Sequence, residues 1–217
     1  MAEFCYSPLM ICAIRGARLD SGGAPAPGAN NLWESRTMLS LGVQPQTEAG
    51  TRINVKTGCD ETCLTYEGQD KPTFDTLSLE LCQLEIGLLE ILTGGTVITS
   101  GGDVVGFERR PASAGRYDGA SLETWSIAWD GDQQAVDAVT GDPLYFKFAW
   151  PKTTWTVGSM TFGNDAVRIP LTGKGLRNSQ FGTGPLGDWP TAISEPGAFV
   201  LTTEIPDGEC GYQSLAS

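Results

Sequence analysis

Histidine is absent from this chain of 217 residues, and its absence removes several classes of function at once. Histidine is the side chain that titrates near neutral pH, the usual base of a Ser-His-Asp triad and a frequent ligand of zinc. No other catalytic constellation stands in its place in the sequence. We therefore expect a protein that is not an enzyme and that carries no cofactor and no metal.

One acid-based chemistry stays open, because a pair of carboxylates is sufficient for glycoside hydrolysis. Asp188 with Glu195, or Glu80 with Glu85, are pairs of this kind. Any acidic chain offers such pairs, however, and the sequence does not fix their separation.

Basic residues are also scarce. The chain has 14 Lys and Arg against 26 Asp and Glu, which gives a formal net charge of -12. A surface of this charge repels polyanions, whereas nucleic-acid binding draws most of its affinity from cations that neutralise phosphates. Tight or sequence-specific nucleic-acid binding is therefore not expected.

Long apolar runs are missing as well. No run approaches the roughly 18 residues that a membrane-spanning helix needs. The N-terminal segment carries Glu3 where a signal peptide is basic, and Pro8 and Arg15 interrupt its apolar stretch. We expect no membrane association.

The six cysteines are too dilute in a chain of this length to form a disulfide framework. Buried free thiols are the expectation. Cys59 and Cys63 lack the additional ligands that a zinc site requires. A bond between Cys63 and Cys82 stays open, because the two could lie on adjacent strands.

The sequence does contain a succession of strand patterns separated by glycine-rich turns. A chain of this size can form one large all-β domain. Alternating apolar residues predict strands at residues 36–44, 51–56, 73–82, 121–129, 143–150, 152–162, 165–175 and 198–205. The first two are predicted to form a hairpin around a turn at 45–50. Residues 19–31 are predicted to form a flexible loop, and residues 59–72 an acidic, turn-rich segment.

The run from residue 73 to 95 changes its period from two to 3.6. Leu77, Leu79 and Leu81 alternate with polar residues as in a half-buried strand. Residues 84, 88, 91 and 92 then form an apolar stripe, which predicts a short helix over about 84–93, and Gly94 is placed to end it. The fold class that follows is mostly β, a β-sandwich or partial barrel with one short flanking α-helix.

For three further patterns we favour an ordinary structural role over a binding site. The glycines at 182, 184 and 187 match G-x-G-x-x-G, but no strand-to-helix passage surrounds them. The run that begins at Asp130 resembles a calcium loop, but it lacks the required glycine and glutamate. Four tryptophans on successive strands could form a sugar-stacking platform, although such residues are more often core or interface. They are Trp125, Trp129, Trp150 and Trp155.

Several segments occur in an order that is similar to a known family. The segments are T-G-C-x-x-x-C-L-T-Y-x-x-x-D-K at 57–71, LSLELCQLEIGLLEILTGG, VVGFERRP at 104–111, SLETWSIAW, PLYFKFAWPKTTW, and LTGKGLRNSQFGTGPLGDWP at 171–190. Together they resemble the major tail proteins, or tail tube proteins, of long-tailed phages of actinobacteria. The likeness covers roughly residues 33–190. It does not include the N-terminal arm and loop (1–32) or the C-terminal extension (191–217) of what we expect to be one tail-tube domain.

The resemblance implies a structural virion protein that assembles in the host cytoplasm into the phage tail. Six copies would close into a ring, and stacked rings would form a tube whose acidic bore lets DNA pass without specific binding. The implied partners are further copies of the chain and other tail proteins: the tape measure, the tail terminator and the distal tail protein. The alternative is a monomeric, aromatic-rich β-sandwich that binds carbohydrate.

Three sets of residues are predicted to serve the tube. Glu48, Asp75 and Glu80 are candidates for the bore, because they lie on the segments expected to line it. Arg52 and Lys56 are candidates for pairing with a neighbouring subunit. The candidates for contact between rings lie in the loop at 19–31 and the segment at 59–72: Ser21, Gly22, Pro25, Pro27, Asp60, Glu61 and Asp70.

Overall fold

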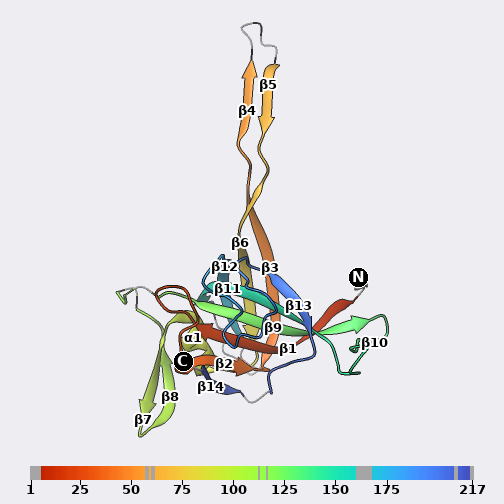
Figure 1. The fold of residues 1–217 in the computed structure, drawn as a ribbon. Helices are drawn as coiled ribbons and strands as arrows, with labels where there is room; N and C mark the ends of the chain where they lie inside the picture. The colour runs from red at the N-terminus through yellow and green to blue at the C-terminus, as the bar shows by residue number, and fades with distance from the viewer. Residues whose placement is uncertain are drawn as a thin grey trace.

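A computed structural model describes residues 6–56, 59, 62–111, 113–115, 117–159, 168–207 and 210–215, and the structural statements below concern these residues (Figure 1). Strands dominate, and the described residues contain one short helix. The prediction of a mostly β fold is confirmed. The large antiparallel sheet does not close into a barrel and is consistent with a β-sandwich or partial barrel.

The main sheet has ten strands, and its path runs in the order β14-β2-β1-β9-β11-β12-β6-β3. These strands are β1 (Ser7–Arg18), β2 (Gly28–Ser35), β3 (Met38–Glu48), β6 (Lys71–Leu81), β9 (Ala120–Asp130), β11 (Tyr145–Val157), β12 (Ile169–Leu176) and β14 (Gly211–Leu215). Off this path, β10 (Gln133–Gln134) pairs with β9, and β13 (Ala198–Thr202) pairs with β11. An antiparallel sheet of this kind can bury one face and leave the other in water.

The core lies between the sheet and α1 (Ile86–Thr93). Leu77, Leu79 and Leu81 of β6 are buried, in the alternation that the sequence predicts, and the helix packs against β1, β2 and β11. The helical side chains buried in this core are Leu88, Leu89, Ile91 and Leu92. The strand and the helix of the 73–95 run therefore share one core.

The helix ends as predicted but begins later. Gly94 adopts the left-handed conformation with φ of 68° and donates its N–H to the Glu90 carbonyl. Leu84 lies outside the helix and is exposed, because Glu85 occupies the N-cap position and is held elsewhere. The buried carboxylate of Glu85 accepts hydrogen bonds from Trp33 Nε1 at 2.8 Å and from Ser35 Oγ at 2.5 Å.

The predicted hairpin between residues 36–44 and 51–56 is wrong. β3 pairs with β6, whereas β4 (Arg52–Lys56) pairs with β5 (Thr62–Glu67), so the two segments follow one another along one arm of a longer hairpin. The pairing with β6 places Met38 opposite Leu81 and Leu41 opposite Leu79. This register places Met38 in the core and Leu41 against it, whereas Leu39 and Val43 are exposed.

Other predicted boundaries also change. The segments predicted at 143–150 and 152–162 both contribute to one strand, β11, which runs through Pro151 and ends at Val157, and residues 160–162 lie outside the described residues. Its pairing with β9 shifts between Trp150 and Thr153, the kind of irregularity at which a proline without an N–H is tolerated. Part of the loop at 19–31 belongs to β2, and the segment at 59–72 contains β5 and the start of β6. The strand predicted at 198–205 is found as β13, and the strand predicted at 165–175 is β12, although 165–167 lie outside the described residues.

Candidate functional site

A two-stranded arm projects far from the main sheet. Figure 1 shows β4 and β5 at its distal end, carried away from the body of the molecule by β3 and β6. The glycines at the junction let the two chains approach closely: a Cβ on Gly50 would lie 1.9 Å from the Gly68 carbonyl oxygen. Asp70 supports the same junction, because its side chain accepts the Gly50 N–H at 2.9 Å.

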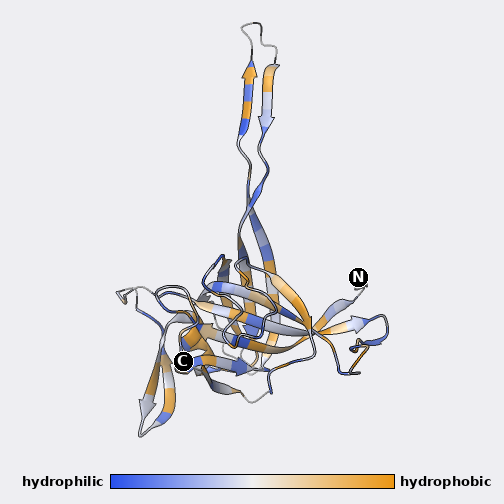
Figure 2. Ribbon diagram, viewed as in Figure 1, coloured by the Kyte–Doolittle hydropathy of each residue, from blue (hydrophilic) through white to orange (hydrophobic). Residues whose placement is uncertain are grey.

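The distal hairpin has one apolar face. Ile53 lies opposite Tyr66, and Val55 lies opposite Leu64, so the four side chains project from the same side of the ribbon. They are 45, 55, 45 and 56% exposed in that order. The other face carries polar pairs such as Asn54 with Thr65. Figure 2 shows this mixture of hydrophobic and hydrophilic residues along β4 and β5.

An isolated hairpin of this kind is marginally stable in water, since it needs a further strand or a packed surface to bury its apolar side chains. Nothing in the described part of the chain covers the face formed by residues 53, 55, 64 and 66. An exposed apolar face of this kind is typical of a surface that contacts another molecule.

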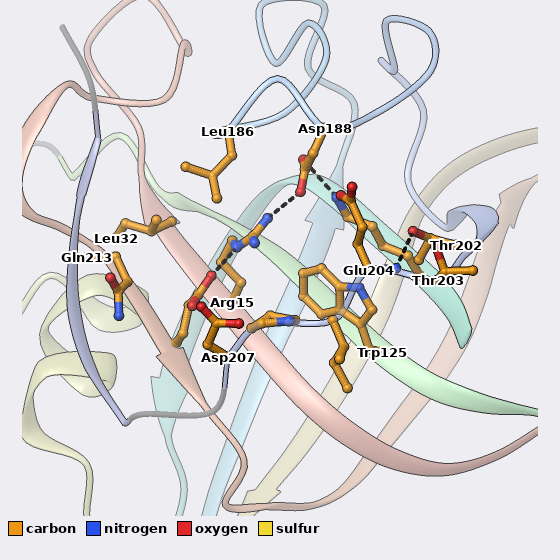
Figure 3. Close-up of a pocket in the computed structure, with 14 residues that line it drawn as sticks. Arg15, Leu32, Trp125, Leu186, Asp188, Thr202, Thr203, Glu204, Asp207 and Gln213 are labelled. Atoms are coloured by element: carbon orange, nitrogen blue, oxygen red, sulfur yellow. Dashed lines mark hydrogen bonds and ion pairs between the residues drawn. The ribbon is translucent and has the colours of Figure 1, made fainter. Parts of the chain in front are cut away.

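A buried cluster of charged side chains holds the body of the molecule together (Figure 3). Arg15 of β1 contacts three carboxylates: Nε lies 2.8 Å from Glu34, and Nη1 lies 3.1 Å from Glu123 and 2.8 Å from Asp188. Lys147 of β11 lies 3.1 Å from Glu123 and 2.8 Å from Asp188. Two cations thus face three carboxylates, leaving one net negative charge.

The cluster also includes aromatic rings. Both cations lie over the Trp125 ring, the Arg15 guanidinium 4.8 Å and Lys147 Nζ 5.1 Å from its centroid. Trp189 donates its indole N–H to Glu123. These contacts connect β1, β2, β9 and β11 with the loop that carries Asp188, and the cluster lies on the floor of a cavity of about 710 Å³. The charged cluster therefore joins the sheet to this loop through buried ion pairs and hydrogen bonds.

The contribution of the charged cluster to stability should depend on pH. Burial raises the pKa of Asp188, but Lys147 and Arg15 outweigh burial and hold that pKa below its ordinary value of 3.8. A carboxyl group with a lowered pKa stabilises the fold above its unfolded-state pKa, and this contribution is lost as the pH falls through the folded-state value. We expect the free energy of unfolding to fall steeply below pH 3.8, and Asp188→Asn to remove part of that slope. Denaturant titrations of both proteins across this range would measure it; equal slopes would contradict the assignment.

The three residues predicted for the bore do not form an acidic wall in this subunit. Asp75 is buried on the same face of β6 as Leu77 and accepts a hydrogen bond from Trp150 Nε1 at 3.0 Å. It was predicted to line the bore, but residues 75 and 77 share one side of a strand, and that side is buried here. Glu80 lies 3.5 Å from Arg168, and Glu48 lies opposite Lys71.

The residues predicted for contacts between subunits are divided between two regions. Arg52 and Lys56 are exposed on β4, and Arg52 lies 3.8 Å from Glu67 of β5. Asp60 and Glu61 lie outside the described residues. Asp70 is at the glycine junction of the arm. Arg52, Lys56 and Asp70 therefore belong to one projecting element, which is a paired ribbon and not a loop.

The loop that contains Ser21, Gly22, Pro25 and Pro27 is tied to its own subunit. Asp20 accepts the N–H groups of Gly22 and Ala24 at 2.8 and 2.9 Å. Asn178 donates to the Gly23 carbonyl at 2.7 Å. These bonds make a compact turn, and its role between rings stays a prediction.

The tryptophans predicted as core or interface are mostly core. Trp125, Trp150 and Trp155 are buried, and Trp129 is half-buried with its indole N–H on the Gly131 carbonyl. These four rings therefore do not form an exposed platform on which a sugar could stack. The glycines at 182, 184 and 187 lie in a loop that no helix follows among the described residues, so the surroundings of a nucleotide site are missing there.

The cysteines differ from the expectation of buried thiols. Cys59, Cys63, Cys82 and Cys210 are exposed, and all are free. The bond that the sequence left open between Cys63 and Cys82 is not formed, because Cys63 lies in the distal hairpin and Cys82 follows the far end of β6. The described residues contain no group of three or more Cys, Asp or Glu placed to hold a metal ion, and no helix among them is long and apolar enough to cross a membrane.

No protein-family model and no curated protein sequence matches this chain. Its function therefore has to be inferred from the geometry. The alternation of Ile53 and Val55 is visible in the sequence, but the apolar face of the arm also needs Leu64 and Tyr66, which only the pairing of β4 with β5 places beside them. The charged cluster was missed, although a signal exists: Lys147 stands between two phenylalanines in a buried strand, and Glu123 stands in another strand of the same kind.

Proposed function

We propose that this chain is a structural subunit of a phage tail tube, which self-assembles in the host cytoplasm into rings that stack within the virion. The projecting arm is the observation that carries the proposal. It extends from a folded body, ends in a ribbon with one exposed apolar face, and has nothing in its own described chain to bury that face against. A repeating partner, a second copy of the same chain, explains these features.

The arm suits contact along the tube axis. Its length carries the apolar face beyond the body of its own subunit, so the face reaches the copy in the next ring. Burying four exposed apolar side chains supplies a hydrophobic driving force, at roughly 25 cal/mol for each Å² of apolar surface removed from water. Other tail proteins, such as the tape measure, the tail terminator and the distal tail protein, are the expected partners at the ends of the tube and within it.

The outer face of β3, β6 and β12 suits a passage for DNA. Gly42 lies opposite Ser78, which in turn lies opposite Thr172, and all three are exposed. Gln44 and Thr76 continue this face. Most of these side chains are short and uncharged, although Lys174, opposite Thr76, and Glu80, opposite Ser40, belong to the same face. The chain's net charge of -12 repels phosphate groups at longer range. This face is our candidate for the wall of the bore, with DNA passing and not binding.

The apolar face of the arm provides the test. Ile53→Asp together with Tyr66→Asp should abolish tubes, because two desolvated carboxylates at a buried contact cost more than the contact gains. Negative-stain microscopy and sedimentation velocity of the purified proteins would show tubes for the unchanged chain and single rings or smaller species for the variant.

A matched control lies on the opposite face of the same hairpin. Asn54→Asp together with Thr65→Asp adds the same charge at neighbouring positions without touching the apolar face. This control should still form tubes. If the unchanged protein stays monomeric at high concentration, the proposed function is wrong; if only the control loses its tubes, the polar face makes the contact.

A further inference from the structure

Two regions with exposed apolar side chains lie at opposite ends of β9. Arg109 and Arg110 precede this strand in the chain, and the segment 130–142 follows it. β9 has 11 residues, so at about 3.3 Å per residue the two ends are separated by on the order of 35 Å. Figure 1 shows the same separation, with β7 and β8 on one side of the molecule and β10 and β13 on the other.

The first region is the hairpin of β7 (Thr96–Ser100) and β8 (Asp103–Glu108). It belongs to neither the main sheet nor the arm. Its base is fixed, because Phe107 packs so closely over Gly95 that a Cβ there would lie 2.3 Å from the ring. Its apolar side chains beyond the base are exposed: Ile98, Val104 and Val105.

The second region is an apolar groove of about 730 Å³. Phe199 of β13 is 64% exposed at its edge, and its ring lies 6.1 Å from Phe146 and 5.8 Å from Phe148 of β11. The groove is completed by Tyr6, Pro8, Val200 and Leu201. Phe199 is the exposed ring of this group, since Phe146 is buried and Tyr6 and Phe148 are half-buried. Aromatic rings around an apolar hollow are typical of the centre of a protein interface.

The charges beside the two regions are opposite. The segment 130–142 next to the groove has four aspartates and no lysine or arginine: Asp130, Asp132, Asp137 and Asp142. Arg109 and Arg110 directly follow β8, and Arg110 lies over the Tyr117 ring at 5.6 Å. The hairpin itself carries Asp103 at its tip and Glu108 at its base, so the two arginines lie at the base, whereas four aspartates lie beside the groove.

We propose that the β7–β8 hairpin of one copy docks into the groove at Phe199 of the next copy, with Arg109 and Arg110 against the acidic segment 130–142. Because the two surfaces differ and lie at opposite ends of the subunit, the contact is head-to-tail, the kind that closes into a ring when the rotation permits. This inference rests on the proposed self-assembly and assigns the surfaces that join neighbours within a ring. The arm would join one ring to the next.

A mixing experiment tests the head-to-tail contact. All proteins carry Ile53→Asp and Tyr66→Asp, which block stacking and leave single rings. One variant adds Val104→Asp and Val105→Asp, which disable its hairpin; the other adds Phe199→Asp, which disables its groove. Each alone should be a monomer in sedimentation velocity. Mixed in equal amounts, they should form a dimer and nothing larger, because one intact hairpin and one intact groove remain.

The dimer is also an internal control for folding, since two unfolded proteins would not recombine into a defined species. It should weaken as the salt concentration rises, because the charges at its rim are screened. The inference is overturned if either variant alone keeps the rings of its parent, if the mixture remains monomeric, or if the stacking-deficient parent forms no rings. All of these results leave intact a proposed function that is judged on the tubes of the unchanged chain.

Discussion

Replacing Lys147 with methionine should lower the free energy of unfolding by about 3–5 kcal/mol, the cost of breaking a buried ion pair by removing one partner. Lys147 is 2% exposed and lies within 3.1 Å of two carboxylates. Methionine keeps most of the side-chain volume, so the loss is mainly electrostatic. Without the lysine, Arg15 alone faces Glu34, Glu123 and Asp188, and the cluster carries two net negative charges. Chemical denaturation monitored by tryptophan fluorescence would measure the change.

A second substitution separates charge from packing. Glu123→Gln in the Lys147→Met background returns the cluster to one net negative charge, so part of the lost stability should come back. The surface pair of Arg177 with Glu195 is the matched control: its atoms lie 2.7 Å apart, but both side chains are more than half exposed. Arg177→Met should change stability by less than about 1 kcal/mol. If Lys147→Met and Arg177→Met lower the free energy of unfolding equally, burial of the cluster does not increase its contribution to stability.

The cluster also explains why the loop at 177–197 has a fixed position without regular structure. Asp188 and Trp189 bind the charged groups of β9 and β11, and Asn178 binds the backbone of the turn at Gly23. A loop held at both ends by buried polar contacts behaves as part of the body.

The sequence predicted the local elements of this fold well. Alternation in the 73–95 run identified the buried leucines of β6, and the change to helical spacing identified α1 and its glycine stop. These signals are local, because the side chains that face the core repeat every two residues in a strand and every three to four in a helix. The start of the helix was misplaced at Leu84, since the contacts of Glu85 with Trp33 and Ser35 are not local.

Strand pairing was predicted poorly, for a related reason. A short turn-like segment after Val43 made pairing with 51–56 attractive, but β3 instead pairs with β6, more than twenty residues further on. What decides between the two is the burial of Met38 and Leu41 against a core built from distant segments. The apolar face of the distal hairpin is visible only after that pairing is known, because Tyr66 and Leu64 come from a segment whose acidic, turn-rich sequence does not predict a strand.

Replacing Gly87 with alanine should destabilise the protein by about 2 kcal/mol, although alanine is the better helix former by about 1 kcal/mol. Gly87 is buried in α1 at the point where the helix approaches Trp33 of β2 and Tyr212 of β14. A Cβ there would lie 2.2 Å from Trp33 Cζ3 and 2.9 Å from Tyr212 Cζ. Neither ring can easily retreat: Trp33 donates to Glu85, Tyr212 donates to Glu90, and the two rings meet edge to face at 4.7 Å.

The same substitution in open space is the control for Gly87→Ala. A Cβ on Gly115 would have no heavy atom within 4 Å, and the residue has no positive φ, so Gly115→Ala should leave stability unchanged or raise it by up to about 1 kcal/mol. Thermal denaturation of both variants would show the difference in sign. If Gly87→Ala raises the melting temperature, the contact between α1 and Trp33 is looser than the structure indicates, and helix propensity alone governs this position. If Gly87→Ala lowers the melting temperature, the close approach of helix and sheet at this position leaves no space for a side chain.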